Sequence, residues 1–366
     1  MAELSPMMQQ YMDIKKQYKD EILFYRIGDF YEMFFDDALT ASRELDLTLT
    51  GKQCGMEERA PMCGVPFHSY EGYVARLIAK GYKVAICEQV EDPAKAKGLV
   101  KRDIIRVVTP GTVIESSMLQ DDRNNYIASI FLKGKKAGLC FADVSTGEFH
   151  ITSLNTAPLQ RQIMNELYTY MPREIIVNND AFDMSLLDNY TKRVDAHLEV
   201  VSAEKFDYET AIKLINDNLS SAQISELNVS ENEIAVCALG AVILYLKDTQ
   251  KKDEIEAPSE LELYDCEKYM KLDMSARRNL ELTRSMMTGD KRHSLLWVID
   301  KTKTSAGKRM IRSWLERPLM SVAKITKRQN AVGELADSPM LRDEVRQALT
   351  GISDIERLLT RIVYST

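Results

Sequence analysis

The chain has 366 residues, of which 45% are hydrophobic and 28% are charged, and its formal net charge is −7. This length is too great for one ordinary hydrophobic core and predicts two or three domains of a soluble globular protein. The acidic balance excludes an overall basic footprint for nucleic acid, although local basic stripes could still bind one.

The cysteines and histidines give no support for a metal site. The six cysteines are far apart without a CxxC pair, and the four histidines form no close pairs, so we expect reduced thiols and no zinc. The N-terminal residues lack the basic and apolar regions of a signal peptide, and the longest apolar run, residues 234–246, is too short to span a bilayer. We therefore expect a cytoplasmic protein with no membrane partner.

Helix and strand signals alternate over the first segment of the chain. Ser5 and Pro6 are typical of a helix start, and Gly28-Asp29 and Pro110-Gly111 are typical strand ends. The pattern predicts helices at residues 5–20 and 69–81 and strands at residues 21–28, 82–90 and 104–111. Residues 1–110 are therefore predicted to form a small mixed α/β domain.

A second α/β domain is predicted over residues 125–250, after a polar linker at residues 111–124. It begins with three apolar runs separated by Gly-Lys and Ser-Thr-Gly turns, which predict an antiparallel meander. Helix and strand signals then alternate. The apolar run at residues 234–246 is predicted to be a buried helix.

A charged stretch at residues 247–260, which contains Pro258, marks a second domain boundary, and residues 251–366 are predicted to be mostly helical. We expect Arg277 and Arg278 to pair with Glu281 along one helix. We interpret Trp314 as a core residue flanked by solvated charges, with a surface for DNA or a partner domain as the alternative. Those flanking charges are Lys308, Arg309 and Arg312.

The stretch "YRIGDFYEMFFDDA", residues 25–38, places aromatic rings and carboxylates two residues apart, directly after a turn-prone Gly-Asp pair. The simpler interpretation is a strand or helix start with aromatic rings in the core and carboxylates on the surface. The alternative is a probe, in which one ring enters a ligand and a carboxylate makes the specific contact.

Several blocks of sequence together resemble the MutS family of DNA mismatch-recognition proteins. They occur in the family's order across nearly the whole chain: "SPMMQQYMDIKKQYKDEILFYRIGDFYEMFFDDA", "APMCGVPFHSYEGYVARLIAKGYKVAICEQVEDP", "VKRDIIRVVTPGT", "KLDMSARRNLEL" and "SLLWVIDKTKTSAGKRMIRSWLERPL". The resemblance implies a mismatch-binding domain, an RNase H-like connector and the N-terminal part of a helical core (lever) domain. It also implies recognition of mispaired or unpaired bases in duplex DNA at the start of mismatch repair.

The family's Phe-x-Glu motif for mismatch reading falls on Phe30 and Glu32. A mismatched pair is weakly stacked, so a Phe ring that enters from the minor groove can stack on the loosened base and kink the duplex. The Glu32 carboxylate would repel the phosphates of intact DNA, and, when protonated, it would donate a hydrogen bond to a displaced purine.

Basic residues of the first domain are expected to contact the DNA backbone. By position in the family's blocks, Lys52 and Arg102 are the better candidates, Arg106 is a further one, and Met62 would line the groove beside the wedge. The same role is assigned more weakly to Lys95, Lys97 and Lys101.

Family members continue into a clamp and an ATPase domain that dimerises, but this chain contains no GxxxxGK[ST] motif. We therefore expect an N-terminal fragment that performs no chemistry and holds no cofactor or metal. The intact protein would use ATP and magnesium, form a homodimer and bind a MutL-like repair factor through the connector.

Two other functions remain open from the sequence. One is a docking module for repair partners. The other is a metal-dependent nuclease centred on Asp143, which ends a predicted strand and has Glu148 and Glu166 further along the chain. An Asp before a Ser-Thr-Gly turn is more often a turn former that bonds its own backbone.

Overall fold

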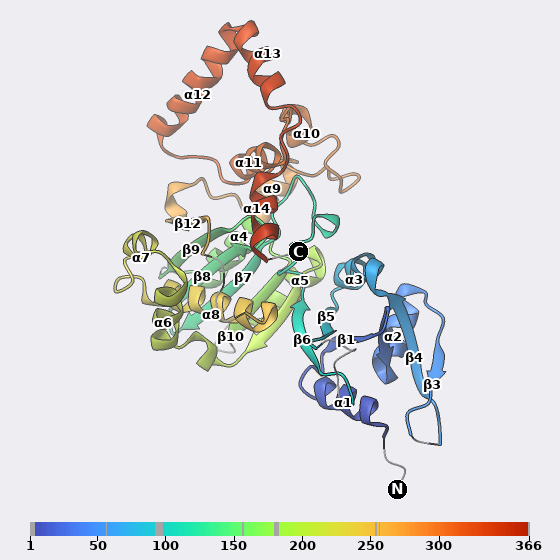
Figure 1. Ribbon diagram of the computed structural model, residues 1–366. Helices are drawn as coiled ribbons and strands as arrows, with labels where there is room; N and C mark the ends of the chain where they lie inside the picture. Colours follow the sequence, from blue (N-terminus) through green and yellow to red (C-terminus); the bar gives the residue numbers. More distant parts are fainter. Residues whose placement is uncertain are drawn as a thin grey trace. The chain divides into compact units, whose positions relative to one another are not determined.

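The computed structural model describes residues 4–55, 57–91, 98–155, 157–178, 183–252, 255 and 257–364. Figure 1 shows the elements in chain order. The chain divides into two compact units, one of residues 1–113 with 244–255 and one of residues 114–243 with 256–366. Each unit is built around one six-stranded sheet.

The first unit is the mixed α/β domain that the sequence predicts. Its strand order is β3-β4-β2-β1-β5-β6, with β1 parallel to β5 and the other neighbours antiparallel. The strands are β1 (Glu21–Ile27), β2 (Phe30–Phe34), β3 (Thr50–Lys52), β4 (Ala60–Pro66), β5 (Lys83–Gln89) and β6 (Arg102–Val108). The helices are α1 (Pro6–Lys15), α2 (Phe35–Leu45) and α3 (Tyr70–Ala79).

The local signals of this unit act as expected, with one difference. Pro6 is the first residue of α1, and Gly81 follows α3 with a φ of +82°, a conformation that glycine adopts at no steric cost. Ser5 precedes α1, but its side chain makes no capping hydrogen bond. The core beneath α1 joins Met8 and Tyr11 to Tyr25 of β1.

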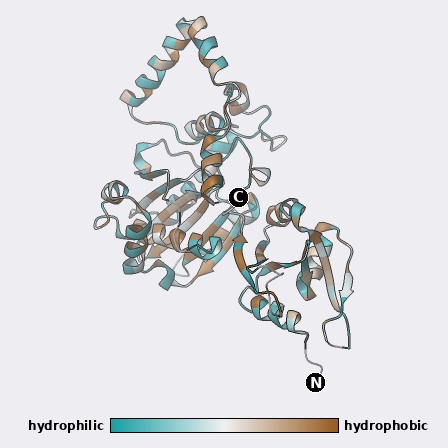
Figure 2. Cartoon of the chain, viewed as in Figure 1, coloured by the Kyte–Doolittle hydropathy of each residue, from teal (hydrophilic) through white to brown (hydrophobic). Residues whose placement is uncertain are grey.

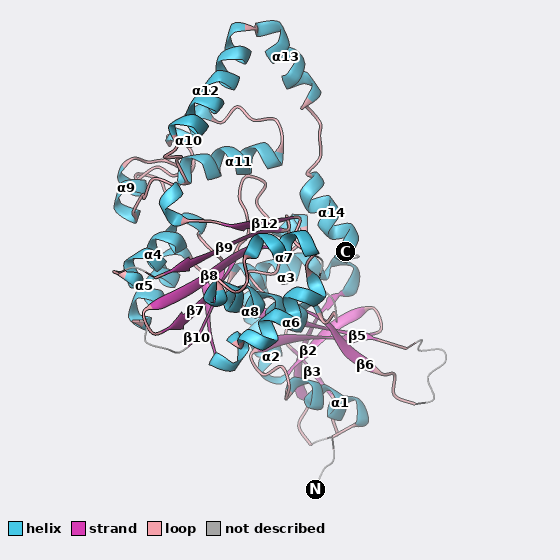
Figure 3. Ribbon diagram, turned by 90° about the vertical axis from the view of Figure 1, so that its left-hand side faces the viewer, coloured by secondary structure: helices cyan, strands magenta, loops and turns pink. Residues whose placement is uncertain are grey.

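The second unit contains the RNase H-like sheet, in the order β11-β10-β7-β8-β9-β12. Strands β7, β8 and β9 form the predicted antiparallel meander (Figure 3). Strand β10 adds in parallel to β7, and β11 adds in parallel to β10. The strands are β7 (Ile127–Lys133), β8 (Lys136–Asp143), β9 (Glu148–Leu154), β10 (Glu174–Asn178), β11 (His197–Val201) and β12 (Glu260–Leu263).

Strand β12 was not expected, because it lies in the region predicted to be mostly helical. It runs parallel to β9, with Glu260 opposite Glu148, so the sheet continues past residue 250, where the connector was predicted to end. The four residues of β12 are too few to show a strand period of their own, and the pairing partner is more than a hundred residues away along the chain.

Helices cover both faces of this sheet, whose strands are largely hydrophobic (Figure 2). On one face, α4 (Leu159–Tyr170) and α5 (Met184–Val194) pack against alternate residues such as Leu139. On the other face lies the first part of α8 (Glu233–Gln250), the predicted buried helix, which approaches Gly138 so closely that an added Cβ would lie 2.0 Å from the Ile234 carbonyl oxygen. The remaining helices before β12 are α6 (Tyr208–Asn218) and α7 (Ser221–Leu227). Among the described helices, none has the length and hydropathy that crossing a membrane requires.

The helical region corrects two expectations. Trp314 is 41% exposed, whereas Arg309 and Arg312 are only 4% and 7% exposed, so the charges are inside and the ring is outside. The arginines can be buried because each pairs with a carboxylate and donates to a main-chain carbonyl oxygen. The Arg328 guanidinium stacks on the Trp314 ring. The helices are α9 (Met274–Asn279), α10 (Leu295–Ile299), α11 (Ser305–Glu316), α12 (Val322–Asp337), α13 (Pro339–Ala348) and α14 (Ile355–Tyr364).

The expected pairing of Arg277 and Arg278 with Glu281 is also wrong. Helix α9 ends at Asn279, and Glu281 has a φ of +46°, so the glutamate is not on the same helix. Arg277 instead donates to the carbonyl oxygens of Leu272 and Glu316.

The predicted linker at residues 111–124 is held rather than loose. Arg312 of α11 donates to the Asp122 carbonyl oxygen at 2.9 Å. Arg357 of α14 donates to the carbonyl oxygens of Gln120 and Arg123 at 2.9 and 2.6 Å. The buried arginines of α11 and α14 therefore fix residues 120–123 through their main chain.

Candidate nucleic-acid interface

A tight hairpin between β1 and β2 presents Phe30. Ile27 is opposite Phe30 in the register, and the two intervening residues, Gly28 and Asp29, make the turn, with Gly28 at a φ of +56°. The Phe67 amide donates to the Asp29 carbonyl oxygen at 3.0 Å, which ties the turn to the end of β4.

Phe30 differs from the other aromatic residues of its strand. It is 47% exposed, whereas Tyr31 is 3% exposed and Phe34 is fully buried. Successive residues of a strand point to opposite faces, so Phe30 and Glu32 share one face of the sheet. The structure therefore places an exposed ring and a carboxylate side by side, on a rigid strand rather than on a loop.

Glu32 forms an ion pair with Lys52, whose Nζ lies 2.5 Å from Glu32 Oε2. The side chains are partly buried, with 15% of Glu32 and 28% of Lys52 exposed. Strand β4 lies between the two residues, and its Gly64 is directly opposite Glu32. Sequence reasoning assigned both residues to DNA and missed that they bind each other.

Met62 lies on β4, where it pairs with Phe34 of β2 on one side and with Thr50 of β3 on the other. Phe30, Glu32 and Lys52 belong to these same three strands. Met62 is half-buried and packs against the core beneath α1. The predicted wedge, its carboxylate and the predicted groove residue thus belong to the neighbouring strands β2 and β4.

The predicted arginines lie at the other edge of the sheet, on β6. Arg102 donates to the Arg26 carbonyl oxygen at 2.7 Å and to Gln10 Oε1 at 3.1 Å, and Arg106 donates to the Thr112 carbonyl oxygen at 3.1 Å. Both guanidinium groups are thus engaged inside the first unit. The side chain of Lys101 is exposed, and Lys95 and Lys97 lie outside the described residues.

Arg26 is a supporting residue that the sequence did not indicate. Its guanidinium carbon lies 3.6 Å from the centre of the Phe67 ring, and its Nη1 lies 3.2 Å from Glu88 Oε1. The Tyr31 hydroxyl donates to the same carboxylate, where burial and the charge of Glu88 raise the pKa of Tyr31 well above its usual range. These contacts brace the hairpin from the face opposite Phe30.

Asp143 and Glu148 lie opposite each other on β8 and β9, but among the described residues the three carboxylates of the nuclease alternative do not form a group with metal-ligand spacing. Asp143 Oδ1 accepts from the Ser145 amide at 2.9 Å and its Oδ2 from the Asn125 amide at 3.0 Å, as a turn former would. Burial, followed by the charge of Asp143, raises the pKa of the Glu148 carboxyl to about 7. Glu166 accepts from the Tyr264 hydroxyl at 2.7 Å.

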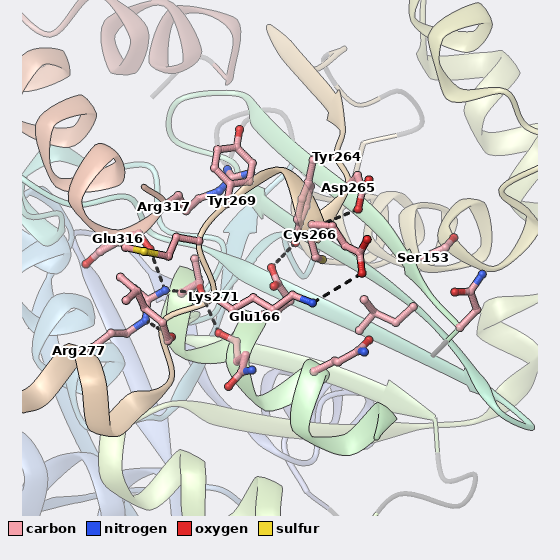
Figure 4. A pocket seen from close by; sticks show the side chains of 18 residues that line it. Ser153, Glu166, Tyr264, Asp265, Cys266, Tyr269, Lys271, Arg277, Glu316 and Arg317 are labelled. Carbon is pink, nitrogen blue, oxygen red and sulfur yellow. Dashed lines mark hydrogen bonds and ion pairs between the residues drawn. The ribbon is translucent and has the colours of Figure 1, made fainter. Parts of the chain in front are cut away.

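Glu166 instead lines a pocket of about 280 Å³ between α4 and the segment after β12 (Figure 4). The Arg317 guanidinium on its wall lies 4.8 Å from the Tyr264 ring centre and 4.2 Å from that of Tyr269. A different set, Glu174, His197 and Glu199 on β10 and β11, has ligand atoms within 4.8 Å of one another. Each of those three side chains is engaged in a further interaction, and their spacing alone does not identify a metal site.

Comparison with known proteins identifies the three segments. Models of MutS domain I, MutS domain II and MutS domain III match residues 5–117, 125–259 and 275–366. The chain is 48% identical to the DNA mismatch repair protein MutS of Ruminiclostridium cellulolyticum, over 99% of this chain and 41% of the relative. It is 46% identical to that of Lachnoclostridium phytofermentans, over 100% of this chain and 39% of the relative.

The chain thus spans about two fifths of the length of these relatives. Three consecutive MutS domain models account for most of its residues, and the relatives cover nearly all of it. The chain belongs to the MutS family.

Proposed function

We propose that the protein recognises mispaired or unpaired bases in duplex DNA at the start of mismatch repair, with Phe30 as the wedge. One observation carries the proposal. Phe30 is 47% exposed at the end of a braced hairpin, although neighbouring aromatic side chains of the strand are buried. The relatives, which are named for DNA mismatch repair, support the choice of ligand.

The wedge acts by exploiting weak stacking. A mispaired step costs less to open than a paired one, so an apolar ring can enter it from the minor groove and kink the duplex. Stacking of a base on an aromatic ring contributes about 1–3 kcal/mol and tolerates any base, so one ring can detect many different mispairs. A wedge on a strand loses little conformational entropy when it binds.

The remaining roles belong to the whole protein. We propose that it acts as a homodimer in the cytoplasm, couples mismatch binding to ATP hydrolysis with magnesium, and recruits a MutL-like factor through the RNase H-like connector. The part described by the structure would supply recognition and the path to the helical core, and would itself perform no chemistry.

The test compares the wild-type protein with the Phe30→Ala variant, both as the full-length protein. Fluorescence anisotropy gives Kd for a matched duplex and for the same duplex with one G·T pair, at one fixed salt concentration. We expect Phe30→Ala to weaken G·T binding by about 5- to 150-fold, which corresponds to about 1–3 kcal/mol. Matched-duplex binding should change less than about twofold, because that binding comes from phosphate contacts.

Leu39→Ala is the matched control, because Leu39 is a similarly exposed apolar residue (46%) that lies on α2 of the same unit. It should leave both affinities unchanged. An undiminished preference of Phe30→Ala for the G·T duplex would overturn the wedge.

A further inference from the structure

We propose that Lys52 is the counter-ion of Glu32 before DNA binds, and that mismatch binding transfers Lys52 from Glu32 to a DNA phosphate. The inference rests on the proposed function and adds a specificity-determining residue to it. Its basis is the distance of 2.5 Å between Lys52 Nζ and Glu32 Oε2. A lysine poised to bind any phosphate would instead extend into solvent.

The backbone prepares this pair. Lys52 lies on the edge strand β3, and Glu32 lies two strands away on β2, so the lysine side chain must cross β4. Gly64 faces Glu32 on β4, and a Cβ there would lie 3.2 Å from the Tyr31 carbonyl oxygen and 3.5 Å from Glu32 Cγ.

Burial stabilises the Glu32–Lys52 ion pair as long as no DNA phosphate is available to Lys52. Both side chains are mostly buried, so leaving either charge unpaired would cost free energy. Lys52 Nζ also lies 5.6 Å from the Phe34 ring centre, close enough for a cation–π contribution. Within the described residues, Lys52 is the cation that pairs with the Glu32 carboxylate.

The exchange follows from the position of Glu32 beside the wedge. On a matched duplex Phe30 stays outside the stack, Glu32 meets no displaced base, and Lys52 remains bound to it. At a mismatch the inserted Phe30 displaces a base, Glu32 bonds to that base, and the released Lys52 gains a phosphate oxygen. Mismatch binding therefore includes one more lysine–phosphate contact than matched binding.

Salt dependence measures that contact. Each phosphate contact adds about 0.9 to the slope of log K against log salt. In the wild-type protein the G·T duplex should thus show a slope steeper by about 0.9 than the matched duplex. Between 50 and 200 mM salt, the preference for G·T should fall by about 3.5-fold.

Two variants should each abolish the difference in salt slope between the G·T duplex and the matched duplex, one by lowering the first slope and the other by raising the second. Lys52→Met should lower the slope for the G·T duplex to that for the matched one. Glu32→Gln should raise the slope for the matched duplex, because Lys52 then has no carboxylate partner on either DNA. Lys52→Arg, which keeps the charge, should retain most of the difference and shows that a loss in Lys52→Met does not come from misfolding.

The exchange would be overturned if the wild-type protein showed the same slope for both duplexes and Lys52→Met lowered both slopes equally. Lys52 would then be a phosphate contact that is made on any duplex. Phe30→Ala separates this failure from failure of the proposed function. If that variant loses the G·T preference while the slopes show no exchange, only the present inference falls. If it keeps the preference, the wedge itself is wrong.

Discussion

Replacement of Glu148 by glutamine is expected to stabilise the second unit at alkaline pH. Glu148 begins β9 opposite Asp143, and its Oε2 accepts from Asn124 Nδ2 at 2.8 Å and from the Tyr126 hydroxyl at 3.3 Å. A glutamine carbonyl can accept both hydrogen bonds. Glu148→Gln therefore removes the charge and keeps its hydrogen-bonding partners.

The magnitude follows from the pKa. Burial, then the charge of Asp143, raises the pKa of Glu148 from 4.5 to about 7. Because the folded protein holds this proton more tightly than the unfolded chain, the free energy of unfolding falls as pH rises from about 4.5 to about 7 and stays low above that. A shift of about 2.5 units corresponds to a loss of about 3 kcal/mol, which the variant should not suffer.

Tryptophan fluorescence during urea unfolding is the assay. Both tryptophans of the chain, Trp297 and Trp314, belong to the same compact unit as Glu148. The stability advantage of Glu148→Gln over wild type should grow by about 2–3 kcal/mol between pH 5 and pH 8. Glu226→Gln, on the exposed surface of α7, is the control and should follow wild type. If the curves of Glu148→Gln and wild type stay parallel from pH 5 to pH 8, the assignment of a buried, proton-holding carboxyl is wrong.

Gly138→Ala should destabilise the second unit by at least about 1–3 kcal/mol in the same assay, because the new Cβ would lie 2.0 Å from a backbone oxygen of α8. Gly333→Ala in α12, with nothing within 4 Å of its Cβ position, should instead be neutral or stabilising by up to about 1 kcal/mol, and equal effects would contradict the packing. Arg309→Met should cost about 3 kcal/mol, since it removes the guanidinium 2.7 Å from the Asp354 carboxylate and leaves that carboxylate, among the described residues, only Arg357 at 3.8 Å. A loss below about 0.5 kcal/mol would show that this pair is as weak as a surface pair.

Local patterns predicted the parts of the fold that local chemistry controls. The turn at Gly28-Asp29, the meander of β7 to β9 and the buried helix α8 each depend on residues close together in sequence. Turn residues and a strand period of two predict the turn and the meander, and a continuous apolar run predicts the buried helix. The motif in the sequence indicates Phe30, whereas only the structure shows that its ring is exposed.

Several of the failures have a different cause, which is pairing between elements that are not neighbours in sequence. The Glu32–Lys52 ion pair depends on the order of three strands, and β12 depends on an edge formed more than a hundred residues earlier. The inversion of Trp314 and Arg309 arose because an arginine in a helical pattern usually implies solvent. Arg309 is buried instead because it pairs with the carboxylates of Asp354, directly before α14, and Glu356 of α14.

The arginine contacts to residues 120–123 have a consequence for how this segment tolerates mutation. Arg312 and Arg357 bind it chiefly through main-chain carbonyl oxygens, which every amino acid supplies. Its path is therefore encoded in helices α11 and α14, 190 to 237 residues further along the chain. A saturation-mutagenesis map should accordingly show two sensitive positions at the arginines and broad tolerance at Gln120 and Arg123, whose carbonyl oxygens they hold.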